Sequence, residues 1–388
     1  MSDASDFGKP DIATLLASVL PDSSGSMTPP IVQSSLFSFD SFEAFEARMA
    51  GNSDAVIYTR VQNPTVAAFE NLMAKAEEGE GAVGFASGMA AIASTLLAFV
   101  KPGDRIACCE HVYPDTFRFM ERLLRPFGVE VTYHSVRQFA DDPDLLSGVT
   151  VAYLESPSSV VFEPMDLPRV AEQARHHGAI TMIDNSWATP VFQKPLTLGI
   201  DIVLHSASKY ISGHSDTVAG VVIASQSHIA RIRDLTLPLL GGKLAPFEAF
   251  LLTRGLRTLS ARMKQHQATA DLFVDRLATL SHVVRVNSPG ANSVPGLTGR
   301  SGLMSVEFDN GIDIPAFSNA LTLFRLGVSW GGFESLILPT RVALAQAGEQ
   351  NSLQKFGVSP NLVRLSFGLE DAEDLWADFI NALSQSAA

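Results

Sequence analysis

The chain has 388 residues, 46% of them hydrophobic and 18% charged, so it is long enough to form two domains around a large core. Its formal charge is −13, from 28 basic and 41 acidic residues, which argues against a general affinity for nucleic acid or anionic membranes. The N-terminus has no secretory signal and the densest apolar run, residues 89–100, is too short to cross a bilayer of about 30 Å, so we expect a cytoplasmic protein with no membrane or nucleic-acid partner.

The first part of the chain, residues 1–56, is expected to be an N-terminal arm. Residues 28–39 are too rich in proline at their start for a helix. Residues 41–49 alternate acids with Phe at helical spacing and end at a Gly-Asn pair, which predicts a helix. A polar loop, residues 58–65, then leads into an amphipathic helix over residues 66–76. An arm of this composition packs against another part of the protein.

From residue 81 onward, strands and helices alternate regularly. The expected strands cover residues 81–87, 105–110, 129–135, 149–156, 179–185 and 200–206. The expected helices cover residues 89–100, 115–127 and 167–176. Strands separated by helices of about 10–15 residues indicate an α/β domain with a mainly parallel sheet and helices on both faces. Cys108 and Cys109 are adjacent in an apolar strand, which suits buried thiols and neither a disulfide nor a metal site.

The pattern changes near Pro246. Residues 247–280 are almost continuously compatible with a helix, which is expected to leave the large domain. Short segments follow that predict a smaller α+β domain, with strands at 283–286, 302–308 and 362–367 and helices at 315–323 and 373–383. We therefore expect a large domain over residues 57–247 and a small C-terminal domain over residues 248–388.

Chemistry is expected where the last two predicted strands of the large domain end. One strand ends in Asp184, and the other runs into the segment HSASKY, which carries Lys209. Ligands bind at the carboxyl ends of parallel strands, so the sheet should bring this acid and this lysine to one edge. Pyridoxal 5'-phosphate (PLP) requires a lysine for covalent attachment, an acid facing the pyridine nitrogen and small hydroxyl residues for its phosphate. Taken singly, an Asp capping a loop and a Lys on the rim would be the simpler interpretation.

The segment SASKYISGHSDTVAG, residues 206–220, resembles the lysine signature of the Cys/Met-metabolism family of PLP enzymes, the cystathionine lyases and synthases. The resemblance covers about residues 28–383. It implies the aspartate aminotransferase-like fold (PLP fold type I), with a mainly parallel seven-stranded sheet between helices in the large domain. It also implies a homotetramer, a dimer of dimers in which two chains share each active site.

The resemblance implies a role for each candidate residue of the large domain. Lys209 carries the cofactor and moves the substrate proton, and Asp184 keeps the ring nitrogen protonated. A carboxylate and a pyridinium about 4 Å apart attract by ~4 kcal/mol at an effective dielectric of about 20. The phosphate is expected to be held by a strand-to-helix junction and by the hydroxyls beside the lysine, namely Ser87, Gly88, Met89, Ser206 and Ser208.

Three further residues complete the implied cofactor site. Tyr113 follows the cysteine-containing strand and is expected to stack on the ring, although such an aromatic is usually part of the core. Tyr58 and Arg60 precede the first strand and are expected to reach the phosphate bound by the neighbouring subunit, where the Arg fork suits an oxyanion. Tyr58 and Tyr113, with Lys209, form the expected catalytic set, and no metal is expected.

The small domain is expected to bind the substrate. Arg364 lies within an apolar strand pattern and needs an anion, because burying a lone charge is costly. A structural salt bridge to Glu370 or Asp371 would meet this need. The resemblance instead implies that Arg364 binds the substrate α-carboxylate, with Ser329 of the segment SWGGFESL beside it. Trp330 stands where synthases and γ-lyases typically have Leu, and the segment looks like that of bacterial cystathionine β-lyases.

Two departures from the family pattern bear on the site. Many members have an Asn at the position of Ser159, whereas this chain has a serine there, as the β-lyase branch does. The residue that contacts the 3-oxygen of the cofactor is therefore left open. Residues 287–300 are short and lack the histidines of many relatives, so part of the substrate entrance is expected to differ.

We therefore predict a PLP-dependent carbon–sulfur β-lyase that cleaves L-cystathionine to homocysteine, pyruvate and ammonia, in methionine biosynthesis and transsulfuration. The alternatives on the same scaffold are a cystathionine γ-lyase, a γ-synthase and a broad cysteine or cystine C–S lyase. A non-catalytic PLP-binding regulator is another class. A nucleotide-binding α/β protein is disfavoured, because no glycine-rich fingerprint follows the first strand.

Overall fold

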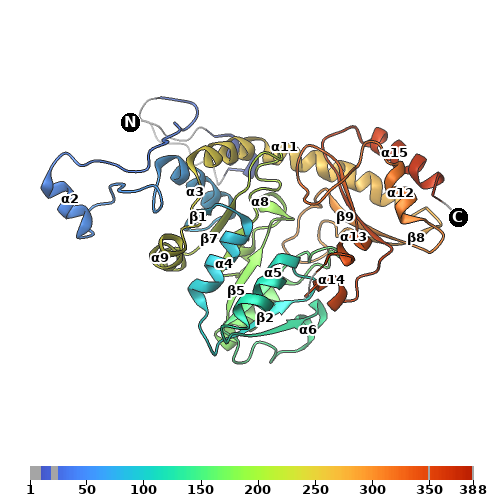
Figure 1. The fold of residues 1–388 in the computed structure, drawn as a ribbon, viewed down its shortest axis with the longest axis horizontal. Coiled ribbons are helices and arrows are strands. Elements are labelled where there is room, and N and C mark those ends of the chain that lie inside the picture. Colours follow the sequence, from blue (N-terminus) through green and yellow to red (C-terminus); the bar gives the residue numbers. More distant parts are fainter. Residues whose placement is uncertain (1–9, 19–24, 348–349, 387–388) are drawn as a thin grey trace.

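The computed structural model describes residues 10–18, 25–347 and 350–386, and two sheets organise this part of the chain (Figure 1). The larger sheet has seven strands in the order β1-β7-β6-β5-β4-β2-β3, and the smaller has five in the order β10-β11-β12-β9-β8. Neighbouring strands among β2 to β6 are parallel, whereas β7 pairs antiparallel with β1 and β6. The prediction of an α/β fold with a mainly parallel seven-stranded sheet is confirmed.

The larger sheet consists of β1 (Gly81–Phe85), β2 (Arg105–Cys109), β3 (Glu130–His134), β4 (Val151–Glu155), β5 (Ile180–Asp184), β6 (Ile202–His205) and β7 (Gly220–Ala224). The six predicted strands are confirmed to within two residues at each end. The seventh, β7, was not predicted, because it starts directly after a Gly-rich polar segment that suggests a turn.

Helices cover both faces of this sheet because its strands are apolar on both sides. Along β7, Val222 and Ala224 join one buried cluster, whereas Val221 and Ile223 join the other. The first cluster packs under α4 (Gly88–Phe99), α5 (Pro114–Phe119) with a π-helical turn (Met120–Leu124), α6 (Val136–Asp141), α7 (Leu167–His177), α9 (Gln226–Asp234) and α10 (Thr236–Leu240). The second packs under α1 (Ile12–Ala17), α3 (Pro64–Glu77), α8 (Thr189–Phe192) and α11 (Pro246–Leu277). A 3-10 turn (Pro195–Leu198) lies between α8 and β6.

The long helix α11 runs from the larger sheet toward the smaller one (Figure 1). Leu252, Leu256 and Leu259 lie one turn apart on a single face and pack on the larger sheet. Phe273 and Leu277 continue the same side of the helix into the core of the smaller sheet. One helix therefore contributes to both cores, and the expected boundary between residues 247 and 248 stays a prediction.

The smaller sheet consists of β8 (Val283–Asn287), β9 (Leu303–Phe308), β10 (Arg325–Leu326), β11 (Leu336–Pro339) and β12 (Leu362–Ser366). Its helices are α12 (Ile314–Ala320), α13 (Thr340–Leu344), α14 (Ser352–Lys355) and α15 (Ala372–Ser384). Phe273 is central to the core, with Phe367 and Phe379 at ring-centroid distances of 4.5 and 5.7 Å.

The predicted helix of the arm is present as α2 (Phe42–Met49), which projects away from the body of the molecule (Figure 1). No residue of α2 is buried, and Phe42 is 73% exposed. The expected arm boundary at residue 56 stays a prediction. None of the helices within the described ranges combines the length and the apolar character needed to span a membrane.

Candidate active site

Three ionisable residues follow one another along one edge of the larger sheet, at the carboxyl ends of β4, β5 and β6. We call this region the carboxyl edge. Glu155 ends β4 and lies opposite Asp184, the last residue of β5, in the parallel register. Lys209 lies in the turn after β6, close enough for the charge of Asp184 to act on the pKa of its amine. The predicted meeting of Asp184 and Lys209 is therefore present.

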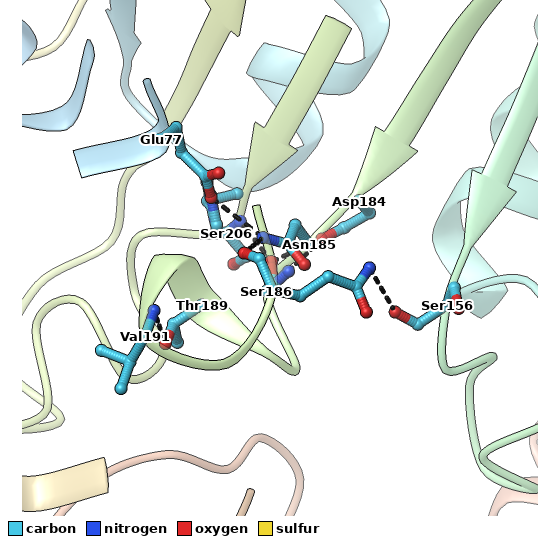
Figure 2. Close-up of polar contacts among 10 residues, drawn as sticks. Glu77, Ser156, Asp184, Asn185, Ser186, Thr189, Val191 and Ser206 are labelled. Carbon is cyan, nitrogen blue, oxygen red and sulfur yellow. Dashed lines mark hydrogen bonds and ion pairs between the residues drawn. The ribbon is translucent and has the colours of Figure 1, made fainter. Parts of the chain in front are cut away.

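Asp184 is held by a serine two residues further along the chain. Its Oδ1 accepts hydrogen bonds from the backbone N–H of Ser186 at 2.9 Å and from the Ser186 hydroxyl at 2.5 Å. The same hydroxyl oxygen accepts a bond from the N–H of Ser206 at 2.7 Å, which ties β5 to the segment after β6 (Figure 2). Burial raises the pKa of Asp184, and the bonds of Ser186 and the charge of Lys209 counteract that rise.

Lys209 lies between the two sheets. Its Nζ donates to the Ser329 hydroxyl at 2.6 Å. Burial and, to a lesser extent, the Arg364 guanidinium lower the pKa of the Lys209 amine to about 8, and Asp184 opposes both. An ordinary lysine, with a pKa of about 10.4, is almost fully charged at neutral pH. A lowered pKa leaves a larger neutral fraction, which can act as a nucleophile or accept a proton.

A glycine allows the segment SWGGFESL to approach the lysine. Gly331 has a φ of +82°, and a Cβ atom built on it would lie 2.9 Å from the backbone nitrogen of Tyr210. Any larger residue would therefore be strained and would collide with the lysine turn. The close approach places the Trp330 ring centroid 5.5 Å from the Lys209 amine.

Arg364 lies on β12, with Ser305 of β9 and Leu338 of β11 as its register partners. Its Nη2 donates to the Ser329 carbonyl at 2.7 Å. Burial lowers the pKa of the guanidinium to about 10. Within the described ranges no carboxylate forms an ion pair with Arg364.

The structural salt bridge considered for Arg364 is not formed. Glu370 instead accepts hydrogen bonds from the backbone N–H and the hydroxyl of Ser335, each at 2.8 Å. Asp371 accepts bonds from N–H groups at the start of α15. Among the described residues, this partly buried guanidinium has one backbone acceptor, so it is suited to bind an anion from outside the chain.

The start of α4 offers hydrogen-bond donors for the expected phosphate. The Ser87 hydroxyl accepts a bond from the N–H of Ala90 at 3.0 Å and so caps the helix. In the described part of the chain, the N–H groups of Gly88 and Met89 have no protein acceptor. Such first-turn N–H groups have no partner within a helix and favour anions.

Of the two serines beside the lysine, only Ser206 faces the start of α4. A Cβ atom built on Gly88 would lie 2.9 Å from the Ser206 hydroxyl oxygen, so the glycine permits this close approach. The Ser208 hydroxyl instead donates to the Ala219 carbonyl at 3.2 Å and accepts from the Ala219 N–H at 2.9 Å. Ser208 therefore holds the segment before β7, and its hydroxyl proton is already used.

Tyr113 stands at the start of α5 beside the carboxyl edge and is 40% exposed, so it is not part of the core. Its backbone N–H donates to Glu155 Oε1 at 2.7 Å, and its hydroxyl donates to Asp115 Oδ2 at 2.9 Å. Burial and the nearby Asp115 carboxylate raise the pKa of the Tyr113 phenol. Its hydroxyl therefore stays protonated at neutral pH.

Tyr58 and Arg60 are not joined to the carboxyl edge by any hydrogen bond or ion pair of the described residues. Tyr58 is 44% exposed, and the guanidinium of Arg60 lies 5.8 Å from its ring centroid. Arg60 also donates to the carbonyl of Pro238. Their expected contact with a neighbouring subunit stays a prediction.

A buried polar network lies behind the edge and was not predicted from the sequence. His205 Nε2 lies 2.6 Å from Glu77 Oε1. The Asn185 amide donates to the same oxygen at 2.9 Å (Figure 2). All three side chains are buried. Only the positions of these residues in the sequence could have indicated the network, because Asn185 follows Asp184 and His205 ends the strand before the lysine segment.

The chain is similar to enzymes of sulfur amino-acid metabolism along nearly its whole length. A family model described as Cys/Met metabolism PLP-dependent enzyme matches residues 14–384. An L-methionine gamma-lyase from Pseudomonas putida is 38% identical over 380 residues, with 94% of each chain covered. A cystathionine beta-lyase from Lactococcus lactis subsp. cremoris is 34% identical, with 93% of this chain and 95% of that protein covered. A crystal structure of cystathionine gamma synthase from Xanthomonas oryzae pv. oryzae, in complex with aminoacrylate and cysteine, has a TM-score of 0.88 and 35% identity, with 97% of this chain and 99% of that chain covered.

The residues of the carboxyl edge fit the cofactor of these relatives. The Gly88 and Met89 N–H groups and the Ser206 hydroxyl form a donor set for a phosphate. Asp184 supplies a carboxylate for a cationic ring, and Lys209 supplies an amine for covalent attachment. The described residues contain no group of three or more His, Cys, Asp or Glu side chains suited to a metal ion.

Proposed function

The chain belongs to the family of Cys/Met metabolism PLP-dependent enzymes, and from this premise we propose that it is a carbon–sulfur β-lyase acting on L-cystathionine. The reaction breaks the bond between the sulfur and the β-carbon of the three-carbon half. With one water consumed, the products are homocysteine, pyruvate and ammonia. The observation that carries the proposal is the position of Trp330, in a segment similar to that of bacterial cystathionine β-lyases, 5.5 Å from the Lys209 amine.

We assign the cofactor contacts to residues that the fold gathers at the carboxyl edge. When bound, PLP supplies a ring that accepts electrons from the α-carbon of the substrate. Lys209 would carry it covalently, Asp184 would face its ring nitrogen and Tyr113 would stack on its face. The phosphate would be held by Ser87, Gly88, Met89 and Ser206, with Ser208 fixing the loop around it.

In this proposal the smaller sheet orients the substrate. Arg364 binds its α-carboxylate, because the guanidinium has no acidic partner among the described residues and can form two parallel bonds to a carboxylate. Ser329 lies between Arg364 and Lys209 and contacts both. The carboxylate contact therefore fixes the α-carbon close to the lysine amine.

Lys209 is the proposed proton carrier. Its amine, with its pKa lowered to about 8, takes the proton from the α-carbon and delivers one to the leaving sulfur. Tyr113 keeps its own proton, because burial and Asp115 raise the pKa of its phenol. It therefore donates a hydrogen bond and does not act as a phenolate base.

We also propose that two chains complete each active site and that the assembly is a homotetramer. The arm exposes large apolar side chains, with Met27 70%, Leu36 62% and Met49 67% exposed. Exposed apolar surface of this extent on a projecting arm favours contact with another copy of the chain. Tyr58 and Arg60 follow this arm and would contact the cofactor of the partner.

The cytoplasm is the proposed compartment, and methionine biosynthesis with transsulfuration is the proposed pathway. Cys108 and Cys109 are buried free thiols, in keeping with a reducing compartment.

A γ-lyase acting on methionine or cystathionine is the second candidate. It is favoured by the 38% identity to the Pseudomonas putida protein, which is an L-methionine gamma-lyase. Both reactions begin with proton removal at the α-carbon, so Lys209, Asp184 and Arg364 would have the same roles. The difference is the carbon from which sulfur leaves.

The keto acid identifies the reaction. Purified enzyme loaded with PLP is incubated with L-cystathionine and, separately, with L-methionine. We expect pyruvate and homocysteine from cystathionine and little 2-oxobutyrate from either substrate. If 2-oxobutyrate with cysteine or methanethiol predominates, the γ-lyase is correct. Pyruvate from cystine at a higher kcat/KM would indicate the broad C–S lyase, and PLP binding without turnover of any of these would favour the regulator.

A further inference from the structure

Two loops at the carboxyl edge have strained backbones. His111, in the loop before α5, has a φ of +54°. Val160 and Phe162, in the loop after β4, have φ values of +71° and +50°. A bulky or β-branched residue in this left-handed region is strained and persists only where surrounding contacts fix it. The contacts that fix these loops therefore call for an explanation.

A single carboxyl group joins the two loops. Glu155 Oε1 accepts the backbone N–H of Tyr113 at 2.7 Å, and Glu155 Oε2 accepts the Ser159 hydroxyl at 2.8 Å. We call this pair of hydrogen bonds the Glu155 bridge. A backbone bond from the Ser159 N–H to the His111 carbonyl, at 2.8 Å, runs alongside it. Glu155 is only 5% exposed, so water does not substitute readily for these bonds.

The loop after β4 also reaches the smaller sheet. The Ser305 hydroxyl donates to the carbonyl of Val160 at 2.6 Å. Ser305 lies on β9, directly opposite Arg364 on β12. A continuous set of contacts therefore runs from Tyr113 through Glu155, Ser159 and Val160 to the strand pair that carries Arg364.

We propose that Glu155 is a positioning residue, which sets the orientation of the Tyr113 ring over the cofactor and fixes it relative to Arg364. The proposal rests on the stacking role assigned above to Tyr113. Glu155 itself touches neither substrate nor reacting atoms in this account. A ring displaced by 1 Å is enough to cost about 10²-fold in rate.

The charge state of Glu155 makes a sharp test available. Burial and the neighbouring Asp184 carboxylate raise the pKa of Glu155 to about 8, which favours the neutral acid. A glutamine keeps both contacts, because its oxygen can accept from the Tyr113 N–H and its amide can donate to the Ser159 hydroxyl oxygen, with the direction of the Ser159 bond reversed. Alanine removes both bonds.

The experiment compares Glu155→Ala, Glu155→Gln and Glu163→Ala, all loaded with PLP. Glu163 is the matched control, since it is an exposed carboxylate on the same loop. The first measurement is the visible circular dichroism of the bound cofactor, which reports its asymmetric surroundings and needs no substrate. The second is kcat/KM for cystathionine. For Glu155→Ala we expect an altered dichroism band and a loss of about 10- to 100-fold in kcat/KM. Glu155→Gln and Glu163→Ala should both stay within about threefold of the wild type with unchanged dichroism.

Two results would overturn the proposal. One is wild-type dichroism and kcat/KM in Glu155→Ala. The other is an equal loss in Glu155→Gln and Glu155→Ala, which would assign the effect to charge. If Glu155→Ala does not fold, Ser159→Ala removes one bond of the bridge and must change the dichroism in the same direction. Failure of the β-lyase assignment would alter the keto acid but not the dichroism, so the two proposals fail separately.

Discussion

The carboxyl edge and the loop that carries Tyr58 and Arg60 differ in how many interactions their side chains form within one chain. At the edge, Asp184 has two bonds from Ser186, and Lys209 has one to Ser329. In the loop, Tyr58 is 44% exposed, and among the described residues Arg60 interacts only with the Tyr58 ring and the Pro238 carbonyl. The residues of the edge are therefore held in place within one chain, whereas the loop would acquire its proposed role only in an assembly.

The largest expected effect is a loss of turnover on substitution of Lys209 at the carboxyl edge. Lys209→Ala removes both the attachment point and the proton carrier, so we expect turnover to fall by ~10³-fold or more. The variant should also lack the visible absorbance of covalently held cofactor, while its thermal unfolding midpoint stays close to that of the wild type. Lys194→Ala, at a surface ion pair with Glu78, is the control and should leave turnover unchanged. Substantial pyruvate formation by Lys209→Ala would remove the basis of the mechanism.

The next prediction concerns cofactor binding by the loop that carries Tyr58 and Arg60. Arg60→Ala should weaken cofactor binding by about 10- to 100-fold, because a charge-assisted contact to phosphate is lost. If two chains share each site, unfolding and refolding Arg60→Ala together with Lys209→Ala regenerates one intact site in every mixed dimer.

An equal mixture of the two variants gives half mixed dimers with one working site of two, so we expect about a quarter of the wild-type activity. Refolding Lys209→Ala alone is the control. No recovery in the mixture, with each variant refolding to the native oligomer, would mean that Arg60 acts within its own chain or not at all.

This contrast also explains which features the sequence could predict. Asp184 and Lys209 follow apolar strands, and parallel strands end at one edge, so their proximity follows from topology. Ser186 and Glu155 escaped prediction because their roles depend on side-chain direction after the strand ends, which hydrophobic periodicity does not encode. The engagement of Ser208 with Ala219 depended on β7, a strand that the sequence did not reveal. Arg364 could be placed on a strand, but the absence of an acidic partner within the described ranges needed coordinates.

An effect of similar size concerns the contact between the two sheets. Arg364→Lys keeps the positive charge but loses the planar fork that binds a carboxylate through two bonds. We expect KM for cystathionine to rise by about 10- to 100-fold, since one charge-assisted hydrogen bond contributes about 1.5–3 kcal/mol. The comparison is between kcat and KM at saturating PLP, with Arg341→Lys on α13 as the control. A fall in kcat alone would place Arg364 away from the substrate carboxylate.

The smallest expected effect is on stability and concerns the interior beneath the edge. His266 of α11 is fully buried, and its ring centroid lies 5.0 Å from that of Tyr210, the residue after the lysine. Burial lowers the pKa of His266 to about 4, with Arg262 adding to the effect. An unfolded histidine has a pKa of about 6.5, so the unfolded state binds more protons between these two values. The contribution of the neutral His266 to the free energy of unfolding is fully present above pH 6.5 and is lost as the pH falls toward 4.

Between pH 7 and pH 5 this difference should lower the free energy of unfolding by about 2 kcal/mol. His266→Gln cannot titrate, so its urea unfolding curve should shift less over the same interval, whereas the exposed control His176→Gln should shift as the wild type does. An equal shift in His266→Gln and the wild type would mean that His266 accepts a proton in the folded state, through an opening in the packing around Tyr210. Since the histidine is buried by its own chain, the effect should not depend on protein concentration, in contrast to any effect at Arg60.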